Sequence, residues 1–147
     1  MVKRGVVTLN DPLEKYLPSS VKVPTYHNSG HKITLEDLAT HTSGLPNIPD
    51  RLIDNRTYPT QQVYNFISNS TLMSEPGTRY NYSNLGMGLL GYVLSLKAGM
   101  PYAQLVKDRI LNVLGMDSTG IAMNSTATTT PLPDLLKSRL AKGHLGG

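Results

Sequence analysis

The 147-residue sequence contains no cysteine, no tryptophan and a single phenylalanine. The lack of cysteine excludes disulfide bonds and thiol catalysis, and it leaves the redox compartment undecided. No apolar run approaches the roughly 18 residues that a membrane-spanning helix needs, so we predict no membrane span. The N-terminus also lacks the apolar core of a signal peptide, and the localisation of the protein stays open.

The sequence is also poor in clustered charge. Fourteen lysines and arginines against ten acidic residues give a formal net charge of +4, but the basic residues are scattered. No basic run would follow a nucleic-acid groove, so we predict no nucleic-acid partner. The length suffices for one domain that buries about two thirds of its unfolded surface. An enzyme or a binding module therefore remains possible on size alone.

The most informative stretch is residues 75–92, where a turn leads a Tyr-Ser-Asn triplet onto an apolar helix. A Pro-Gly pair is typical of the tight turn, and Ser83 or Asn84 can cap the helix that follows. The phenol of Tyr82 and the amide of Asn84 would then lie together at a helix N-terminus, where backbone N–H groups and the helix dipole favour negative charge. This pattern predicts a site for a reactive phenol.

A second motif, residues 33–46, reads Ile-Thr-Leu-Glu-Asp-Leu-Ala-Thr-His-Thr-Ser-Gly-Leu-Pro. Together the two motifs closely resemble the serine β-lactamase and penicillin-binding-protein superfamily, in particular class C β-lactamases, D-alanyl-D-alanine peptidases and β-lactamase-like carboxylesterases. The similarity extends from Val2 to the Leu-Gly-Met segment at 114–116. In that superfamily a Ser-x-x-Lys nucleophile helix, a Tyr-x-Asn loop and a Lys-Thr-Gly strand form one pocket, and this sequence clearly contains the loop.

The resemblance implies that the nucleophile helix precedes Met1 and that the Lys-Thr-Gly strand follows Gly147, so that the chain is a middle segment. Two formal Ser-x-x-Lys matches do occur, but composition alone produces such pairs. Proline or glycine also interrupts the helical turn that would bring each hydroxyl to its amine. Neither is a credible nucleophile in our interpretation. The two serines are Ser19 and Ser29.

By resemblance, Tyr82 is the catalytic base, which takes the proton of the nucleophile and later passes it to the leaving group. Asn84 would hydrogen-bond the substrate amide and the lysine of the nucleophile helix. Without the resemblance, the same residues read as a buried tyrosine with one hydroxyl partner and as a helix cap. We interpret Ser83 as support for the turn rather than as an attacking group.

Two histidine patterns require separate interpretation. His41 and Ser43 lie two residues apart and would diverge on a helix, so we predict no catalytic pair. The resemblance implies instead that the motif ending at Gly44 is structural and braces the loop at the active-site rim. His27 and His31 would share a helix face, but the Ser-Gly between them argues against a helix. We therefore predict no metal site and no cofactor.

Hydrophobic periodicity and capping residues predict the helices. Thr34 with Asp37 forms a capping box for a first helix, which Gly44 and Pro46 would stop. Thr60 would cap a second helix. The third and longest spans about residues 84–98, and its leucines cover more than one face, which predicts burial against several partners.

A fourth helix should open at Pro101 and close at Gly115. Its predicted period runs through Tyr102, Leu105, Val106, Arg109, Ile110 and Val113. For residues 134–142 the local pattern favours a helix, whereas the resemblance suggests an extended strand. We favour the helix, because the missing sheet would leave a strand unpaired.

The predicted fold is mainly α: a helical subdomain of the β-lactamase and DD-peptidase α/β fold, with the central sheet largely absent. We divide the chain into an irregular arm at 1–33, a helical subdomain at 34–123 that carries the Tyr-Ser-Asn motif, and a flexible segment with a terminal helix or strand at 124–147.

The leading functional prediction is a fragment of a β-lactamase-like serine hydrolase that transfers acyl groups from small-molecule amides or esters and is inactive alone. A first alternative is a small esterase with an improvised site at Ser83 or Ser43. A second is a non-catalytic module that forms a homodimer through an apolar helix face. That face would expose part of the set Leu85, Leu89, Val93, Leu94 and Leu96. The sequence does not separate lactam, peptide and ester substrates.

Overall fold

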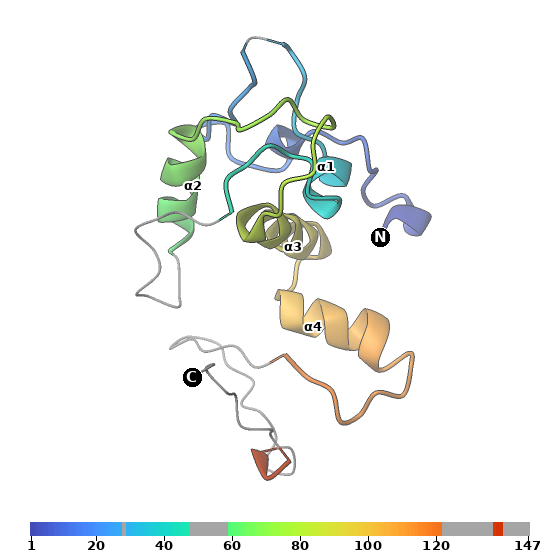
Figure 1. Ribbon diagram of the computed structural model, residues 1–147. Coiled ribbons are helices and arrows are strands. Elements are labelled where there is room, and N and C mark those ends of the chain that lie inside the picture. The colour runs from blue at the N-terminus through green and yellow to red at the C-terminus, as the bar shows by residue number, and fades with distance from the viewer. Residues whose placement is uncertain (28, 48–58, 122–136, 140–147) are drawn as a thin grey trace. The chain divides into compact units, whose positions relative to one another are not determined.

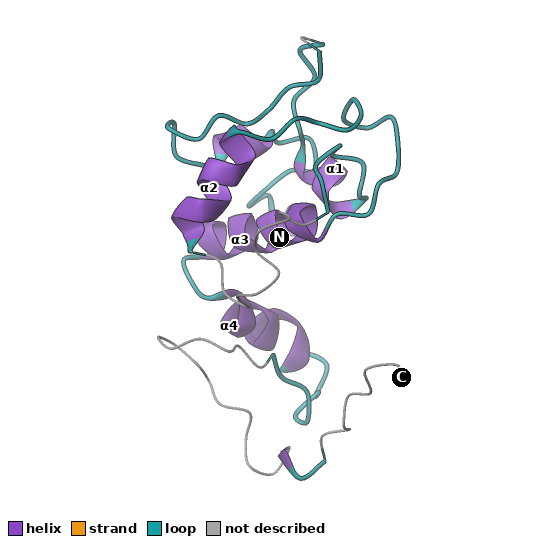
Figure 2. Ribbon diagram, turned by 60° about the vertical axis from the view of Figure 1, so that its left-hand side comes forward, coloured by secondary structure: helices purple, strands orange, loops and turns teal. Residues whose placement is uncertain are grey.

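The computed structural model describes residues 1–27, 29–47, 59–121 and 137–139, and these ranges contain helices, turns and loops but no β-strand (Figure 1, Figure 2). A single isolated bridge pairs Pro12 with Thr34. The mainly α prediction is confirmed for these ranges. In chain order, the elements are two 3₁₀ turns, Val2–Arg4 and Leu13–Lys15, then α1 Leu35–Ala39, α2 Thr60–Ser68, α3 Asn84–Ala98, α4 Tyr102–Val106 and a π-helical segment, Lys107–Leu111.

The chain forms two compact units, Met1–Tyr102 and a second unit that starts at Ala103. The predicted candidate site lies entirely within the first unit. The predicted three-segment division at residues 33 and 123 stays a prediction. In the described ranges, no helix has the length and apolar character needed to cross a membrane.

The start of α1 is fixed by the capping box that the sequence predicts. The Thr34 hydroxyl accepts from the Asp37 amide at 3.2 Å, and the Asp37 carboxylate accepts from the Thr34 amide at 2.9 Å. Its end differs from the prediction, because α1 stops at Ala39, well before Gly44. The chain leaves the helix where His41 adopts a left-handed backbone with φ +59°.

Helix α2 begins at Thr60 without a side-chain cap, since Pro59 is the N-cap residue and offers no acceptor side chain. The helix is predicted correctly, but its cap is not. Tyr64 on α2 and Tyr92 on α3 join the two helices through a 2.6 Å hydrogen bond between their hydroxyls. Burial first, and then the hydrogen bond to Tyr92, raises the pKa of Tyr64 to about 12.

Helix α3 begins at Asn84 and ends at Ala98, as predicted, and it packs against α1. Leu89 and Val93 are buried on one face, whereas Leu96 is 47 % exposed. The predicted burial of α3 against several partners is confirmed in part. Leu85, Leu90, Tyr92 and Leu94 are partly buried against the core, whereas Leu96 is exposed in the described part of the unit. Self-association through the uncovered side stays a prediction.

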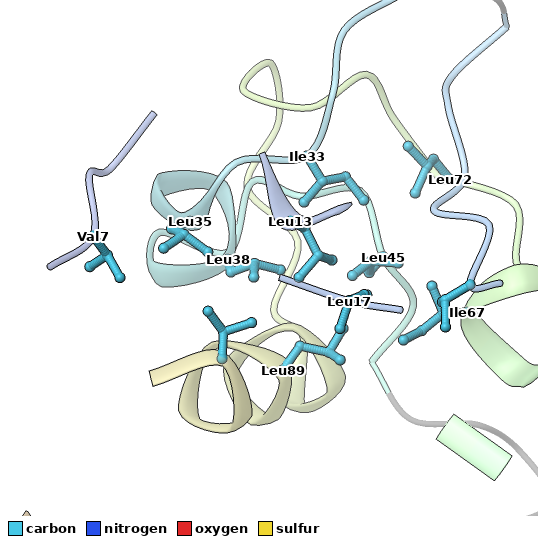
Figure 3. Close-up of a cluster of buried hydrophobic side chains, with 12 residues drawn as sticks. Val7, Leu13, Leu17, Ile33, Leu35, Leu38, Leu45, Ile67, Leu72 and Leu89 are labelled. Carbon is cyan, nitrogen blue, oxygen red and sulfur yellow. The ribbon is translucent and has the colours of Figure 1, made fainter. Parts of the chain in front are cut away.

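The core of the first unit is shared by the N-terminal arm, α1, α2, α3 and the loops between them (Figure 3). Leu13 and Leu17 of the arm lie among Leu38 of α1 and Leu89 of α3, and all four are buried. Full burial of one such side chain stabilises the fold by about 1.5–3 kcal/mol. The arm is irregular, as predicted, but it supplies part of the core.

Asp11 fixes the arm to the start of α1. Its carboxylate accepts hydrogen bonds from the Thr8 amide at 2.8 Å, from the Lys15 ammonium at 2.6 Å and from the Tyr16 hydroxyl, and its backbone carbonyl accepts from the Leu35 amide at 3.0 Å. The Lys15 bond, followed by those from Tyr16 and Thr8, holds the pKa of Asp11 well below its usual range. Burial and the bond to Asp11 raise the pKa of Tyr16 to about 12.

The predicted fourth helix changes type halfway along its length. After α4, the Asn112 amide bonds to the Lys107 carbonyl at 2.9 Å, a five-residue spacing that is typical of a π-helix. The extra residue rotates the chain, so that Leu111 is buried while Ile110 and Val113 are 47 % and 73 % exposed. The predicted period is therefore wrong beyond α4. The helix predicted at 134–142 lies outside the described residues, except for 137–139.

Candidate active site

Ser83 is the N-cap of α3, and its side chain is fully buried. Its hydroxyl accepts from the Gly86 amide at 2.9 Å and donates to the Pro46 carbonyl at 2.8 Å. One side chain thereby satisfies an amide of the first helical turn and holds the helix start to the loop at 40–47. Because this hydroxyl is bonded in both directions and closed to solvent, it is poorly placed for nucleophilic attack.

The loop at 40–47 is held to the segment 72–86 by backbone hydrogen bonds along its length. Four backbone amides of the segment donate to carbonyls of the loop. They are Met73 to Gly44 at 2.8 Å, Gly77 to Thr42 at 2.9 Å, Asn81 to His41 at 2.8 Å and Leu85 to Asn47 at 2.9 Å. The two stretches, which the sequence presents as separate motifs, form one structure that positions the Tyr-Ser-Asn triplet.

Gly44 lies where this crossing is tightest. Its φ is +71°, and a Cβ atom placed there would lie 2.2 Å from the carbonyl oxygen of Ser74. Only glycine fits both the left-handed backbone and this close approach. The neighbouring Ser43 is 1 % exposed, and its hydroxyl accepts from the Leu45 amide at 3.3 Å. This burial closes the Ser43 hydroxyl to a substrate.

Tyr82 and Asn84 differ from the serine between them, because both side chains are exposed. The Tyr82 side chain is 51 % exposed, and its hydroxyl donates to Asn84 Oδ1 at 3.1 Å. Asn84 is fixed in turn by Asn47, whose Oδ1 accepts from the Asn84 backbone amide at 3.0 Å and from its Nδ2 at 2.9 Å. The phenol and the amide thus lie together at the start of α3, open to a partner or substrate.

The imidazole of His41 lies beside the same tyrosine. Its ring centroid is 4.6 Å from that of Tyr82, with the planes inclined by 37°, and 5.8 Å from that of Tyr80 in an edge-on arrangement. Nδ1 accepts a hydrogen bond from the Ser83 amide at 3.2 Å. His41 therefore contacts the Tyr-Ser-Asn triplet rather than Ser43, in line with the predicted absence of a histidine–serine pair.

The side chains at this corner are of the types that serve in general acid–base catalysis. A phenol next to a helix N-terminus can exchange a proton with a bound group, and an amide can orient a carbonyl or an amine. Within the described residues of the first unit, the hydrogen bond of the Tyr82 hydroxyl goes to Asn84, and none joins it to a serine or lysine side chain of that unit.

The two formal Ser-x-x-Lys pairs lie in the arm and do not form nucleophile sites there. Ser19 is exposed, and the Lys22 backbone amide bonds to Ser68 of α2 at 3.1 Å. Ser29 is also exposed, and the Lys32 ammonium pairs with Glu14. Neither lysine is hydrogen-bonded to the serine of its motif.

His27 and His31 are directed to different partners. The His27 ring packs against Tyr26 with centroids 4.3 Å apart, whereas His31 Nδ1 lies 2.8 Å from Glu75 Oε1. Across the described ranges, no group of three or more potential metal ligands gathers at one point.

The sequence model of the β-lactamase family matches residues 1–131. This chain belongs to the β-lactamase family. The match covers both motifs and the whole Tyr82 corner, and it confirms the superfamily to which the sequence resemblance points.

Individual members of the family are similar over most of this chain. The D-alanyl-D-alanine-carboxypeptidase/endopeptidase AmpH of Escherichia coli K12 is 41 % identical, over 91 % of this chain and 33 % of its own length. The human putative beta-lactamase-like 1 is 32 % identical, over 96 % of this chain and 27 % of its own length. A crystal structure of a β-lactamase/D-alanine carboxypeptidase from Yersinia pestis has a TM-score of 0.73 and 38 % identity, over 84 % of this chain and 36 % of the other. The chain thus spans about a third of the length of these relatives.

The structure adds two residues that the sequence did not indicate as part of the site. Asn47 fixes Asn84, and Tyr80 packs on His41. Asn47 lies one residue beyond the Gly-Leu-Pro end of the second motif, and Tyr80 begins the aromatic alternation before the triplet. Their positions beside known motifs were the only available signal, because the contacts they make are distant in sequence.

Proposed function

We propose that this chain supplies the Tyr-x-Asn loop of a β-lactamase-like serine hydrolase, with Tyr82 as the base and Asn84 as the residue that orients the substrate. The observation that carries the proposal is the pairing of two exposed side chains, 3.1 Å apart, at the N-terminus of α3. Membership of the β-lactamase family supports the reaction class.

The proposed reaction is acyl transfer on an amide or ester. As the serine oxygen bonds to the substrate carbonyl carbon, its proton passes to the phenolate of Tyr82. The bond to the leaving group then breaks, and that group takes the proton from Tyr82. Water then attacks the carbonyl carbon of the acyl-enzyme and gives its proton to Tyr82. The bond to the serine oxygen breaks, and that oxygen takes the proton from Tyr82. Asn84 holds the substrate amide through its side-chain amide.

We further propose that the 147-residue chain alone performs no such turnover, because neither formal Ser-x-x-Lys pair of the described first unit is bonded to Tyr82, whose hydroxyl bonds to Asn84. Loss of the nucleophile removes nearly all activity of such a constellation. The test is hydrolysis of nitrocefin and of p-nitrophenyl butyrate by the purified chain and by its Tyr82→Phe variant. Equal background rates are expected. Turnover that depends on Tyr82 would show that a nucleophile is present after all.

The catalytic role of Tyr82 is tested in a full-length relative. Residues 1–131 of this chain would replace the matching segment of E. coli AmpH, with which the chain is 41 % identical. We expect the chimera to retain peptidase activity and to lose at least about 100-fold in kcat on Tyr82→Phe, the usual range for a general base. Tyr102→Phe is the matched control, because Tyr102 is exposed in α4 and is not part of the site, and it should leave kcat unchanged. An active Tyr82→Phe chimera would refute the proposed base.

The improvised-esterase alternative requires a serine hydroxyl that a substrate can reach. Ser83 and Ser43 are 0 % and 1 % exposed, and this burial argues against both. A fluorophosphonate probe labels only an activated serine, so labelling of the purified chain at either position would favour the esterase over the proposal above.

A further inference from the structure

Contacts on both sides of Tyr82 converge on His41. The His41 carbonyl accepts from the Asn81 amide at 2.8 Å, and its imidazole Nδ1 accepts from the Ser83 amide at 3.2 Å. The residues before and after Tyr82 are thus held to one histidine. The proposed acyl transfer gives the imidazole itself no chemical role.

The His41 ring also limits where the phenol can lie. Tyr82 is half exposed, so it has few packing partners, and the His41 ring lies 4.6 Å away between centroids. The hydroxyl at the far end of the phenol is held by Asn84 at 3.1 Å. A ring that is packed at its side and hydrogen-bonded at its tip has one preferred orientation.

The backbone of His41 gives an independent observation. Its φ of +59° lies in the left-handed region, which only a few per cent of residues other than glycine adopt. Strain of this kind persists where the surroundings require it and clusters at functional sites. His41 therefore adopts a sparsely populated backbone conformation next to the proposed base.

We propose that His41 is a positioning residue for Tyr82. In this role the His41 imidazole is neutral, with its proton on Nε2, and its Nδ1 lone pair accepts the hydrogen bond from the Ser83 amide. The functional meaning of this arrangement rests on the proposed function, since a fixed phenol matters when Tyr82 is the base. The contacts themselves do not depend on it. With Nδ1 occupied in this way, His41 holds the loop and exchanges no proton through that nitrogen.

The first test needs no variant. Long-range ¹H–¹⁵N correlation spectra of the ¹⁵N-labelled chain at about pH 8 distinguish a protonated from an unprotonated ring nitrogen. We expect Nδ1 of His41 to be unprotonated. His31 provides the internal contrast, because its Nδ1 faces the Glu75 carboxylate at 2.8 Å and must carry a proton to donate there. A proton on Nδ1 of His41 would overturn the proposal.

The second test compares two substitutions that place an amide oxygen at different positions. His41→Asn puts an acceptor near the place of Nδ1 and suits the left-handed backbone. His41→Gln puts it one bond further out. We expect exchange of the Ser83 amide hydrogen to accelerate about tenfold in His41→Gln and less than about threefold in His41→Asn. Tyr102→Phe is the control, because Tyr102 is exposed in α4 and is not part of the site, and it should leave this rate unchanged.

Equal exchange rates in His41→Asn, His41→Gln and the unmodified chain would refute the bracing role. If either variant fails to fold, the spectrum of the unmodified chain still decides the protonation of Nδ1. The outcome is also separable from the proposed function. If the AmpH chimera with Tyr82→Phe stays active, Tyr82 is not the catalytic base. That result would not change the contacts of His41, which the spectra and the exchange rates test separately.

Discussion

Two helical regions of this chain are held in different ways. Around α1 and α3, the loop at 40–47 and the segment 72–86 share four backbone hydrogen bonds over a core that the arm completes. Between Ala103 and Met116, two leucines are buried, whereas four apolar side chains are exposed. These four are Ile110, Val113, Leu114 and Met116. The comparison teaches that the placement of Tyr82 comes from the bracing around its helix rather than from helical structure as such.

The largest expected effect is at the tightest point of the braced region. Gly44→Ala introduces a Cβ atom 2.2 Å from the Ser74 carbonyl oxygen at a φ of +71°. We expect it to lower the free energy of unfolding by more than about 3 kcal/mol, measured by urea unfolding with circular dichroism. The matched control is Gly88→Ala in α3. A Cβ atom placed there would meet no atom of another segment within 4 Å, so the free energy of unfolding should rise by up to about 1 kcal/mol. Equal effects would show that the crossing is not tight.

A second prediction compares the same substitution in the two regions. Leu38 is 0 % exposed in the core of the first unit, and Leu114 is 66 % exposed in the second. Leu38→Ala should lower the free energy of unfolding by about 2–5 kcal/mol, because it leaves a cavity. Leu114→Ala should change it by less than about 0.5 kcal/mol. Similar losses in urea unfolding would contradict the difference in packing between the regions.

A third prediction concerns the cap that carries the triplet. Ser83→Ala removes the bond from the Gly86 amide and the bond to the Pro46 carbonyl, and it leaves both groups without that partner. We expect a loss of about 1–3 kcal/mol in the free energy of unfolding. Ser19→Ala is the control, because Ser19 is exposed in the arm, and it should be neutral. If Ser83→Ala left the free energy of unfolding unchanged, the Ser83 cap would not stabilise the fold.

The smallest expected effect is a dependence of stability on pH in the braced region. The pKa of Asp11 is lowered in the folded state by its bonds to Lys15, Tyr16 and Thr8. A lowered folded pKa means that the contribution is fully present above the unfolded pKa near 3.8 and is lost as the pH falls below it. Asp11→Asn should flatten the acid limb of stability measured by urea unfolding between about pH 5 and pH 2. If the acid limb stayed unchanged in Asp11→Asn, the loss of stability at low pH would come from other carboxylates.

Much of the braced region was predictable because its signals are local. The Thr34–Asp37 capping box and the bounds of α3 follow from residues within one turn of each other, and the family follows from the two motifs. The prediction was wrong where a helix depends on its neighbours: α1 ends at Ala39, well before Gly44. The π-helical change after Val106 has no residue signature in the pattern that we used.

The sequence by itself determined where helices begin and which family the chain joins, because caps and motifs act over a few adjacent residues. The tertiary structure alone decided that His41 and Asn47 meet the Tyr-Ser-Asn triplet, and that Ser83 is closed while Tyr82 is open. Those contacts join residues about forty positions apart. They form only when the loop at 40–47 crosses the segment 72–86, which local interactions cannot specify.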